Sequence, residues 1–231
     1  MEEAEAWVLL GSLAESRRSR FEAAVWLRSL VAELDEAYGD RRLAPFGFTQ
    51  GQEVQGLLDA GADPLMAVLR SALGASPRPI RWVCIRGPVD PGEGPATQRT
   101  GSAFLAARAA IEAARAGHER LVIRIGRADA DELLDGMAPA LADLLDALTA
   151  RQKAVARLAL IEGLRQSEVA ERLKVRRATI SVSFARAKVI PLARLAAAIR
   201  KACADTRDEA SVVASATATE AIAGRPGPAT E

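Results

Sequence analysis

The sequence is poor in the side chains that most often build metal centres, disulfides and catalytic triads. Its 231 residues include one histidine, two cysteines and one tyrosine, and aromatic residues make up 4%. Neither Cys84 nor Cys203 has a ligand-like neighbour, so we expect no metal site and no disulfide framework. His118 has no paired nucleophile or carboxylate in the sequence around it. We therefore assign no catalytic residue and no cofactor, and we expect that the protein is not an enzyme.

Long apolar runs and a basic leader are lacking as well. No apolar run approaches the roughly 18 residues that a membrane-spanning helix needs, so we expect no membrane contact. The first residues, MEEAEAW, are acidic, unlike the basic start of a signal peptide. Together with the low cysteine content, this predicts a cytoplasmic protein. The apolar content of 49% is ample for two small packed domains.

Charge is unevenly distributed along a chain that is nearly neutral as a whole. The formal net charge is +1, yet residues 151–201 hold 13 Lys and Arg against three acidic residues. Residues 1–150 carry −6, and residues 202–231 carry −3. A charge run alone is usually a solvated face. A strongly basic segment within a neutral chain is nevertheless also typical of a surface that binds nucleic-acid phosphates.

The basic segment also has the pattern of two short helices joined by a tight turn. After a scaffold helix that starts near Leu148, the segments QSEVAERL and RATISVSFARAKVI flank the turn KVR. The apolar residues that we expect to close a small core are Val169, Ala170, Leu173, Val175, Ile180 and Phe184. The second helix would then present outward Arg177, Ala178, Ser181, Val182 and Arg186. Such a helix suits the major groove of double-stranded DNA, and an ordinary surface hairpin is the alternative.

We expect the DNA contacts to come from both helices of this motif. Gln166 and Ser167 start the first helix, and its amide end should face a phosphate. Ser181, Val182 and Arg186 would read base edges. The other expected contact residues are Lys174, Arg176, Arg177, Thr179 and Lys188. Because one helix makes too little contact for a tight complex, we expect a homodimer on paired half-sites, and contact with RNA polymerase is a further expectation.

Residues 1–150 predict an α+β domain. We expect strands at residues 7–10, 43–49, 53–58, 80–85 and 120–125, and helices at residues 16–38, 64–73 and 102–116. The order β-α-β-β-α-β-α-β predicts a ferredoxin-like antiparallel sheet with helices on one face and one added strand. The expected organisation is a ferredoxin-like domain at 5–127, a connecting helix at 128–148, an all-α helix-turn-helix domain at 149–203 and a flexible tail at 204–231.

Short motifs in both parts of the chain resemble known families. The C-terminal part resembles the helix-turn-helix of sigma-factor region 4 and LuxR-type regulators at Leu148, Thr149, Arg151, Gln152, Val155, Gly163, Glu168, Val169, Ala170, Leu173, Val175, Ala178, Thr179, Ile180 and Ser181. The N-terminal part resembles the SatD family of bacterial proteins at Gly11, Ser16, Arg17, Gly51, Glu53, Gln55, Gly56, Leu57, Gly101, Ala103, Phe104, Ala107 and Arg108. In that family a small α+β domain precedes a C-terminal helix-turn-helix. The resemblance implies a transcription regulator whose N-terminal domain serves assembly or ligand sensing.

The expected strands at residues 43–49 and 53–58 form a hairpin, and its context resembles the palm domain of nucleotidyl cyclases, in which carboxylates at two positions hold metal ions. Here Ser12 and Gln52 stand at those positions, and neither supplies the negative charge that magnesium requires. A nucleotide-binding or nucleotidyl-transfer enzyme with an accessory helix-turn-helix is thus the alternative function. The residues around the turn that could bind a ligand are Arg17, Gln50, Gln52, Glu53, Gln55 and Arg108, and a polar rim at a domain interface is the other interpretation.

Overall fold

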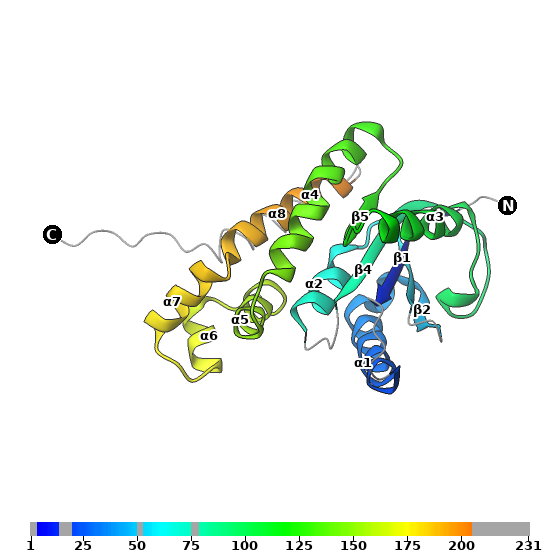
Figure 1. The fold of residues 1–231 in the computed structure, drawn as a ribbon. Helices are drawn as coiled ribbons and strands as arrows, with labels where there is room; N and C mark the ends of the chain where they lie inside the picture. The colour runs from blue at the N-terminus through cyan, green and yellow to red at the C-terminus, as the bar shows by residue number, and fades with distance from the viewer. Residues whose placement is uncertain (1–3, 14–19, 50–52, 75–78, 205–231) are drawn as a thin grey trace. The chain divides into compact units, whose positions relative to one another are not determined.

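The chain folds as two units, residues 1–146 and residues 147–231 (Figure 1). The computed structural model describes residues 4–13, 20–49, 53–74 and 79–204. Three of the residues expected near a ligand, Arg17, Gln50 and Gln52, lie outside the described residues, as does the expected tail from residue 205 onward. The protein belongs to the α+β class.

The first unit contains its strands and helices in the expected order. Its elements are β1 (Ala4–Leu13), α1 (Arg20–Tyr38), the 3-10 helix η1 (Gly39–Arg41), β2 (Arg42–Phe48), β3 (Glu53–Asp59), α2 (Leu65–Leu73), β4 (Ile80–Val89), the 3-10 helix η2 (Ala96–Gln98), α3 (Ser102–Ala116), β5 (Leu121–Arg124) and α4 (Ala128–Asp146). The first strand is longer than its apolar centre at residues 7–10 predicts. Its backbone pairs on both sides along most of its length, and this extends the strand beyond that centre.

The described strands form one mixed sheet in the order β2-β3-β1-β4-β5. The pairs β1–β3, β1–β4 and β2–β3 are antiparallel, whereas β4 and β5 are parallel. The added strand β5 makes the sheet mixed rather than antiparallel throughout, since α3 carries the chain back to start that strand in the direction of β4. The register between β2 and β3 shifts at two places, between Arg42 and Ala44 and between Ala44 and Gly47.

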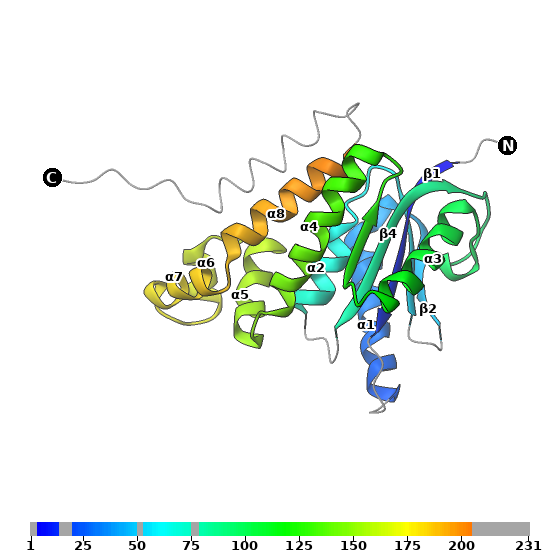
Figure 2. The same ribbon diagram turned by 45° about the horizontal axis from the view of Figure 1, so that its top comes forward.

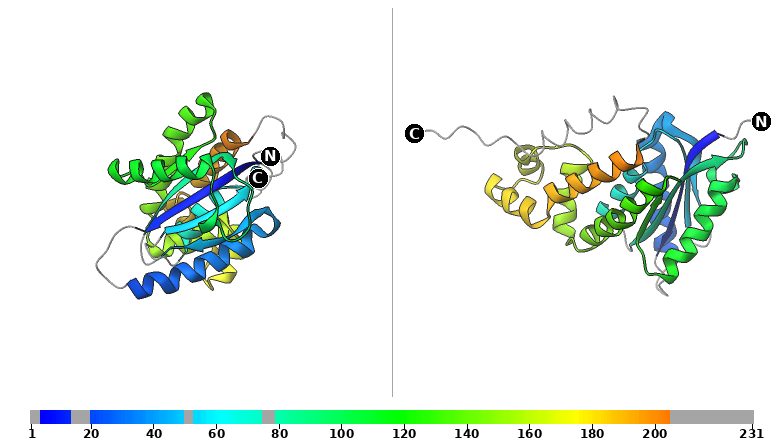
Figure 3. Two further views of the ribbon diagram at one scale, coloured as in Figure 1. Left: turned by 90° about the vertical axis from the view of Figure 1, so that its right-hand side faces the viewer. Right: turned by 90° about the horizontal axis from the view of Figure 1, so that it is seen from above.

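Helices cover both faces of the sheet, which corrects the expectation of helices on one face. Successive strand residues point to opposite faces. Trp82 donates a hydrogen bond from its indole nitrogen to Ser71 Oγ of α2 at 2.8 Å, whereas the neighbouring Val83 packs in the cluster that contains Phe104 and Ile111 of α3. In Figure 2, α3 lies in front of the strands and α1 behind them, and the right-hand view of Figure 3 shows the strands close to edge-on. The crossover from β4 to β5 contains α3 and therefore runs over the sheet face opposite α2.

Gly56 and Gly101, two of the residues that carry the SatD resemblance, have no room for a side chain. A Cβ on Gly56 would lie 2.1 Å from Cε1 of Phe46, the ring that stacks on Tyr38 of α1. Gly101 precedes α3 with φ +131, and its Cβ would lie 2.7 Å from the Val89 backbone. Larger residues at these positions would displace the α1 packing or the start of α3.

The helix expected as a connector is observed as α4 and lies in the first unit. Its buried residues are Ala130, Leu134, Ala138, Leu141, Ala142 and Leu145. The Asp131 carboxylate accepts hydrogen bonds from the backbone N–H groups of Ile125 and Gly126, directly after β5. The start of α4 is thereby fastened to the strand that it follows.

The second unit is a helical array of α5 (Ala150–Leu160), α6 (Gln166–Arg172), α7 (Arg177–Arg186) and α8 (Val189–Cys203). Val169, Ala170, Ile180 and Phe184 are buried, as the spacing predicts. Leu173 is instead 36% exposed and Val175 is only half-buried, so the expected core is smaller by these two residues. Both lie in the turn after α6, where the backbone has left the helix and no longer directs side chains to its apolar face.

None of the helices within the described ranges is long and apolar enough to cross a membrane.

Candidate functional site

The turn between α6 and α7 is a Schellman-type helix end. The Val175 N–H donates to the Ala170 carbonyl at 3.0 Å, and the Lys174 N–H donates to the Glu171 carbonyl at 3.1 Å. Lys174 adopts the left-handed conformation, with φ 53, at the position where glycine is usual. The turn thus redirects the chain within a few residues, and α7 begins at Arg177.

Hydrogen bonds from α5 hold the end of α7 in place. Thr149 caps α5, with its side chain accepting from the Gln152 N–H while the Gln152 side chain accepts from the Thr149 N–H at 2.8 Å. The amide nitrogen of Gln152 also donates to the Arg186 carbonyl at 3.2 Å. One glutamine therefore connects the start of the scaffold helix with the last turn of α7.

The face of α7 opposite its core residues is fully accessible. The exposed residues of this helix are Arg177, Ala178, Thr179, Ser181, Val182, Ala185 and Arg186, which we call the outer face of α7. Ser183 is half-buried and donates its hydroxyl to the Thr179 carbonyl at 2.8 Å. The outer face has an arginine near each end and small side chains between them.

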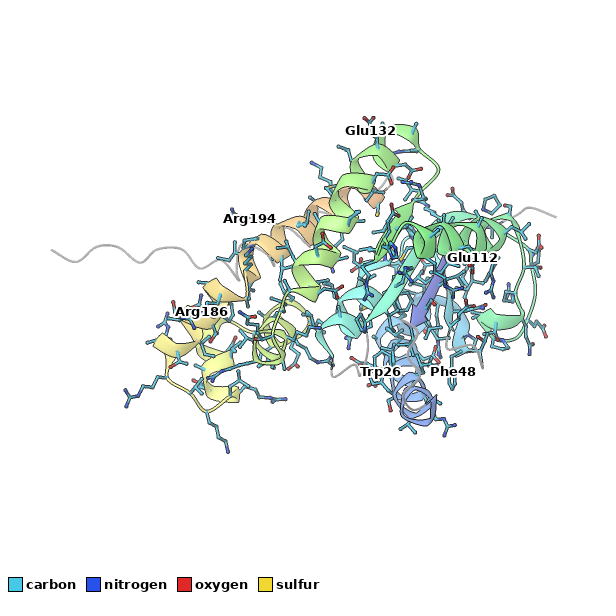
Figure 4. The ribbon with its side chains drawn as sticks, in the orientation of Figure 1. Trp26, Phe48, Glu112, Glu132, Arg186 and Arg194 are labelled. Carbon is cyan, nitrogen blue, oxygen red and sulfur yellow. The ribbon has the colours of Figure 1, made fainter. Side chains whose placement is uncertain are left out.

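Five basic side chains at and beside α7 make no ion pair with any described residue. They are Lys174, Arg176, Arg177, Arg186 and Lys188, and all are exposed. Figure 4 labels Arg186 on α7 and Arg194 on α8, both of them exposed. Arg176 is the N-cap residue of α7, and Lys188, with φ 50, is the N-cap residue of α8. The positive charge around α7 is thus available to an external anion.

The two polar residues expected at the start of the first motif helix are less accessible. Gln166 and Ser167 begin α6 and are half-buried. Beside them, the Glu168 carboxylate accepts from the Arg165 backbone N–H at 2.7 Å and from the Arg165 guanidinium at 3.1 Å. The guanidinium first and the backbone N–H second lower the pKa of Glu168, and Glu168 in turn raises the pKa of Arg165. Glu168 thus compensates the charge of Arg165 at the start of α6.

In the first unit, the carboxylate of Glu53 lies between two arginines of α3, on the sheet face that α3 covers. Glu53 accepts from Arg108 Nη1 at 2.6 Å through Oε2 and from Arg115 Nη2 at 2.8 Å through Oε1. Arg115 Nη2 also donates to Ser12 Oγ at 2.8 Å. Ser12 and Glu53 face each other in the β1–β3 register. We call Ser12, Glu53, Arg108 and Arg115 the Glu53 cluster.

Sequence reasoning placed Glu53 and Arg108 at this edge but missed Arg115. Arg115 stands seven positions after Arg108 in α3, two helical turns further on the same side, and that spacing was the available signal. Gln55, on the same sheet face, is 2% exposed, and its amide nitrogen has no partner among the described residues. Arg81 pairs with Ser12 in the β1–β4 register, and burial first, then the charges of Arg120 and Arg115, lower its pKa.

The Glu53 cluster has little capacity for a metal ion. Both carboxylate oxygens of Glu53 already accept charged hydrogen bonds, and the groups around them are guanidinium groups and a hydroxyl. A divalent cation there would face two positive charges. Within the described ranges, no group of three or more His, Cys, Asp or Glu side chains could hold a metal ion.

No family model and no curated protein matches the chain. A similar solved structure is the regulator of polyketide synthase expression from Bifidobacterium adolescentis, which is 16% identical over 97% of this chain and 83% of that chain. Its TM-score of 0.27 makes this a weak likeness. The resemblance of short motifs to the SatD family stays a prediction.

Proposed function

We propose that the protein is a sequence-specific, DNA-binding transcription regulator. In this proposal α6 and α7 form a helix-turn-helix, and α7 enters the major groove of double-stranded DNA. The observation that carries it is the outer face of α7, accessible along the helix and surrounded by basic side chains without ion-pair partners among the described residues. The excess of 13 basic over three acidic residues at 151–201 supports the same conclusion.

The proposed contacts divide into two kinds. Lys174, Arg176 and Lys188, at the ends of α7, suit phosphates on either side of the groove and would give affinity without sequence preference. Ser181, Val182 and Arg186 lie on the outer face and suit base edges. The hydrogen bond from Gln152 to the Arg186 carbonyl would keep this helix oriented as it enters the groove.

We further propose that the protein acts as a homodimer and that the first unit organises it. One helix of 10 residues covers too little DNA for tight specific binding, and a dimer on two half-sites doubles the contact. The order β2-β3-β1-β4 with its antiparallel pairs supports a ferredoxin-like core, which β5 extends. An assembly or sensing domain followed by a helix-turn-helix is also the arrangement that the SatD resemblance implies.

A pair of matched double variants tests the proposal. The full-length protein would be used to select duplexes from a random DNA library, and the selected duplex would then be titrated. We expect Arg177→Ala/Arg186→Ala to lose at least about 30-fold in affinity, because each of two base contacts contributes about 1–3 kcal/mol. Arg28→Ala/Arg41→Ala removes equal charge from exposed side chains of the first unit and should bind like wild type.

The outcomes separate the proposal from its competitors. Wild-type affinity in Arg177→Ala/Arg186→Ala would refute the role of α7. Selection of no sequence at all, together with salt-sensitive retention on RNA polymerase, would assign the basic surface to a protein partner. We propose no catalytic role for the Glu53 cluster, and magnesium-dependent turnover of a nucleoside triphosphate would contradict that.

A further inference from the structure

Val182 occupies the centre of the outer face of α7. An α-helix turns by about 100° per residue, which places Val182 about 180° away from the midpoint of the buried residues Ile180 and Phe184. The residue is 51% exposed, and it is one of the six exposed large apolar residues in the described part of the chain. The most outward position of the helix thus holds a branched apolar group.

The residues around Val182 cannot replace it as the central contact. Ala178 and Ala185 carry only a methyl group, and the short hydroxyl-bearing side chains of Thr179 and Ser181 lie about 60° and 100° around the helix from Val182. Long side chains with several hydrogen-bond donors occur only toward the two ends of the outer face, at Arg177 and Arg186. A helix with this face can approach the floor of a groove closely, and at its centre it offers apolar contact rather than hydrogen bonds.

In the major groove, one base has an apolar group at its edge. Thymine projects its C5 methyl group there, whereas adenine, guanine and cytosine present hydrogen-bond donors and acceptors. A donor or acceptor pressed against Val182 would lose water without gaining a partner, which disfavours the other bases. A methyl group against the two methyl groups of valine removes apolar surface from water on both sides.

We propose that Val182 is a specificity-determining residue that reads the methyl group of a thymine at the centre of each half-site. The inference rests on the proposed DNA binding and adds the identity of one base to it. It also implies that 5-methylcytosine, which carries a methyl group at the same ring position, would be accepted there in place of thymine.

Replacement of thymine by uracil tests this inference, since it removes the methyl group and leaves every hydrogen-bonding group in place. The probe is the duplex selected by the full-length protein, with each thymine of a half-site replaced in turn by deoxyuridine. Burial of one methyl group contributes about 0.8 kcal/mol, so wild type should bind about fourfold more weakly when one particular thymine is replaced in one half-site only. Replacement at both half-sites should give about 15-fold.

The same series with Val182→Ala shows whether valine is the reader. This variant should bind the thymine and uracil duplexes at that position with the same affinity, and Val182→Thr should lose part of the discrimination. Val25→Ala on α1, where the valine is 50% exposed in the first unit, is the matched control and should discriminate like wild type.

The possible results keep the two proposals apart. If the protein selects a sequence but no thymine shows the uracil effect, the Val182 inference is wrong and DNA binding stands. If the effect persists in Val182→Ala, another residue reads the methyl group and the inference is also wrong. If no sequence is selected, the proposed function fails and the inference fails with it.

Discussion

The two units of the protein use arginine in opposite ways. In the first unit, most of the described arginines are paired with carboxylates of the same unit, as in Arg42–Asp35 at 2.7 Å, Arg70–Glu33 at 2.9 Å and the Glu53 cluster. At and beside α7 in the second unit, arginine and lysine side chains lie exposed without ion pairs to described residues. Charge serves internal connection in one unit and is left available in the other.

This difference in ion pairing explains how a nearly neutral chain presents a basic surface. Paired charges close together cancel each other's field beyond a few ångströms, whereas unpaired charges attract an anion from a distance of about the Debye length, near 8 Å at physiological salt. Net charge of the whole chain, +1, therefore says little about its partners. The placement of carboxylates decides which basic residues act outward.

Neutralising Glu53 should have a larger effect on stability than changes at Gln152, Lys174 or Glu168. Glu53→Gln leaves Arg108 and Arg115 facing each other without a charge between them, which we expect to lower the free energy of unfolding of the first unit by about 2 kcal/mol. Trp7, Trp26 and Trp82 all lie in this unit, so denaturant unfolding followed by tryptophan fluorescence reports on it alone.

The control for Glu53→Gln is Glu112→Gln on α3, the helix that carries Arg108 and Arg115. Glu112 pairs with Arg115 at 2.7 Å, but its side chain is 66% exposed. We expect it to contribute less than about 0.5 kcal/mol. Equal losses in the two variants would show that the position of Glu53 between two arginines has no special role.

A change at Gln152 should affect the second unit and leave the first one unaltered. Gln152→Ala removes the side-chain acceptor for the Thr149 N–H and the bond to the Arg186 carbonyl, so we expect a loss of about 1 kcal/mol. Hydrogen exchange of the amides in α5 and α7 measures it. Gln152→Glu keeps the acceptor for the Thr149 N–H but loses the donor to Arg186, and it should protect α5 better than α7.

Lys174→Gly should increase the stability of the second unit and decrease the affinity for DNA. Glycine relieves the left-handed conformation at φ 53, which we expect to stabilise the second unit by up to about 1 kcal/mol. The loss of one positive charge per protomer should reduce the slope of log K against log salt by about 0.9 for each protomer bound. Lys174→Ala loses the same charge without the conformational relief, so a stability gain in that variant would contradict this explanation.

Lowering the pH should have a smaller effect on stability than these substitutions, and it should act at the start of α6. Because the pKa of Glu168 in the folded protein is lowered, the contribution of its hydrogen bonds to stability is present above the unfolded-state pKa and is lost as the pH falls through the folded-state value. Protection of the α6 amides from hydrogen exchange should decrease as the pH falls below the ordinary pKa range of a glutamate. In Glu168→Gln this pH dependence should disappear, and its persistence would point to another group.

Local periodicity predicted much of the fold and of the candidate interface. The spacing of Ile180 and Phe184 placed both in the core and Val182 on the opposite side, because the helical repeat alone decides which residues share a face. The order of strands and helices in the first unit also follows from alternating apolar patterns. These are properties of short windows of sequence.

Features that depend on how distant segments meet were not predictable in this way. The role of Arg115 depends on the angle at which α3 crosses β1 and β3, and no local pattern carries that angle. The assignment of all helices to one sheet face was wrong for the same reason, since the path of a crossover is set by packing. Leu173 was wrongly placed in the core because a helical repeat was extended into the turn by a single residue.

The irregular pairing of β2 has a consequence for how two copies can associate. The sheet ends at β2 on one side, where two register shifts and Pro45 interrupt the row of backbone groups, and at the four-residue β5 on the other. A long, flat strand is needed for two sheets to join edge to edge. Neither border of this sheet provides one, so we expect two copies to associate through helices, and the sheet to resist the open-ended stacking by which β-rich proteins aggregate.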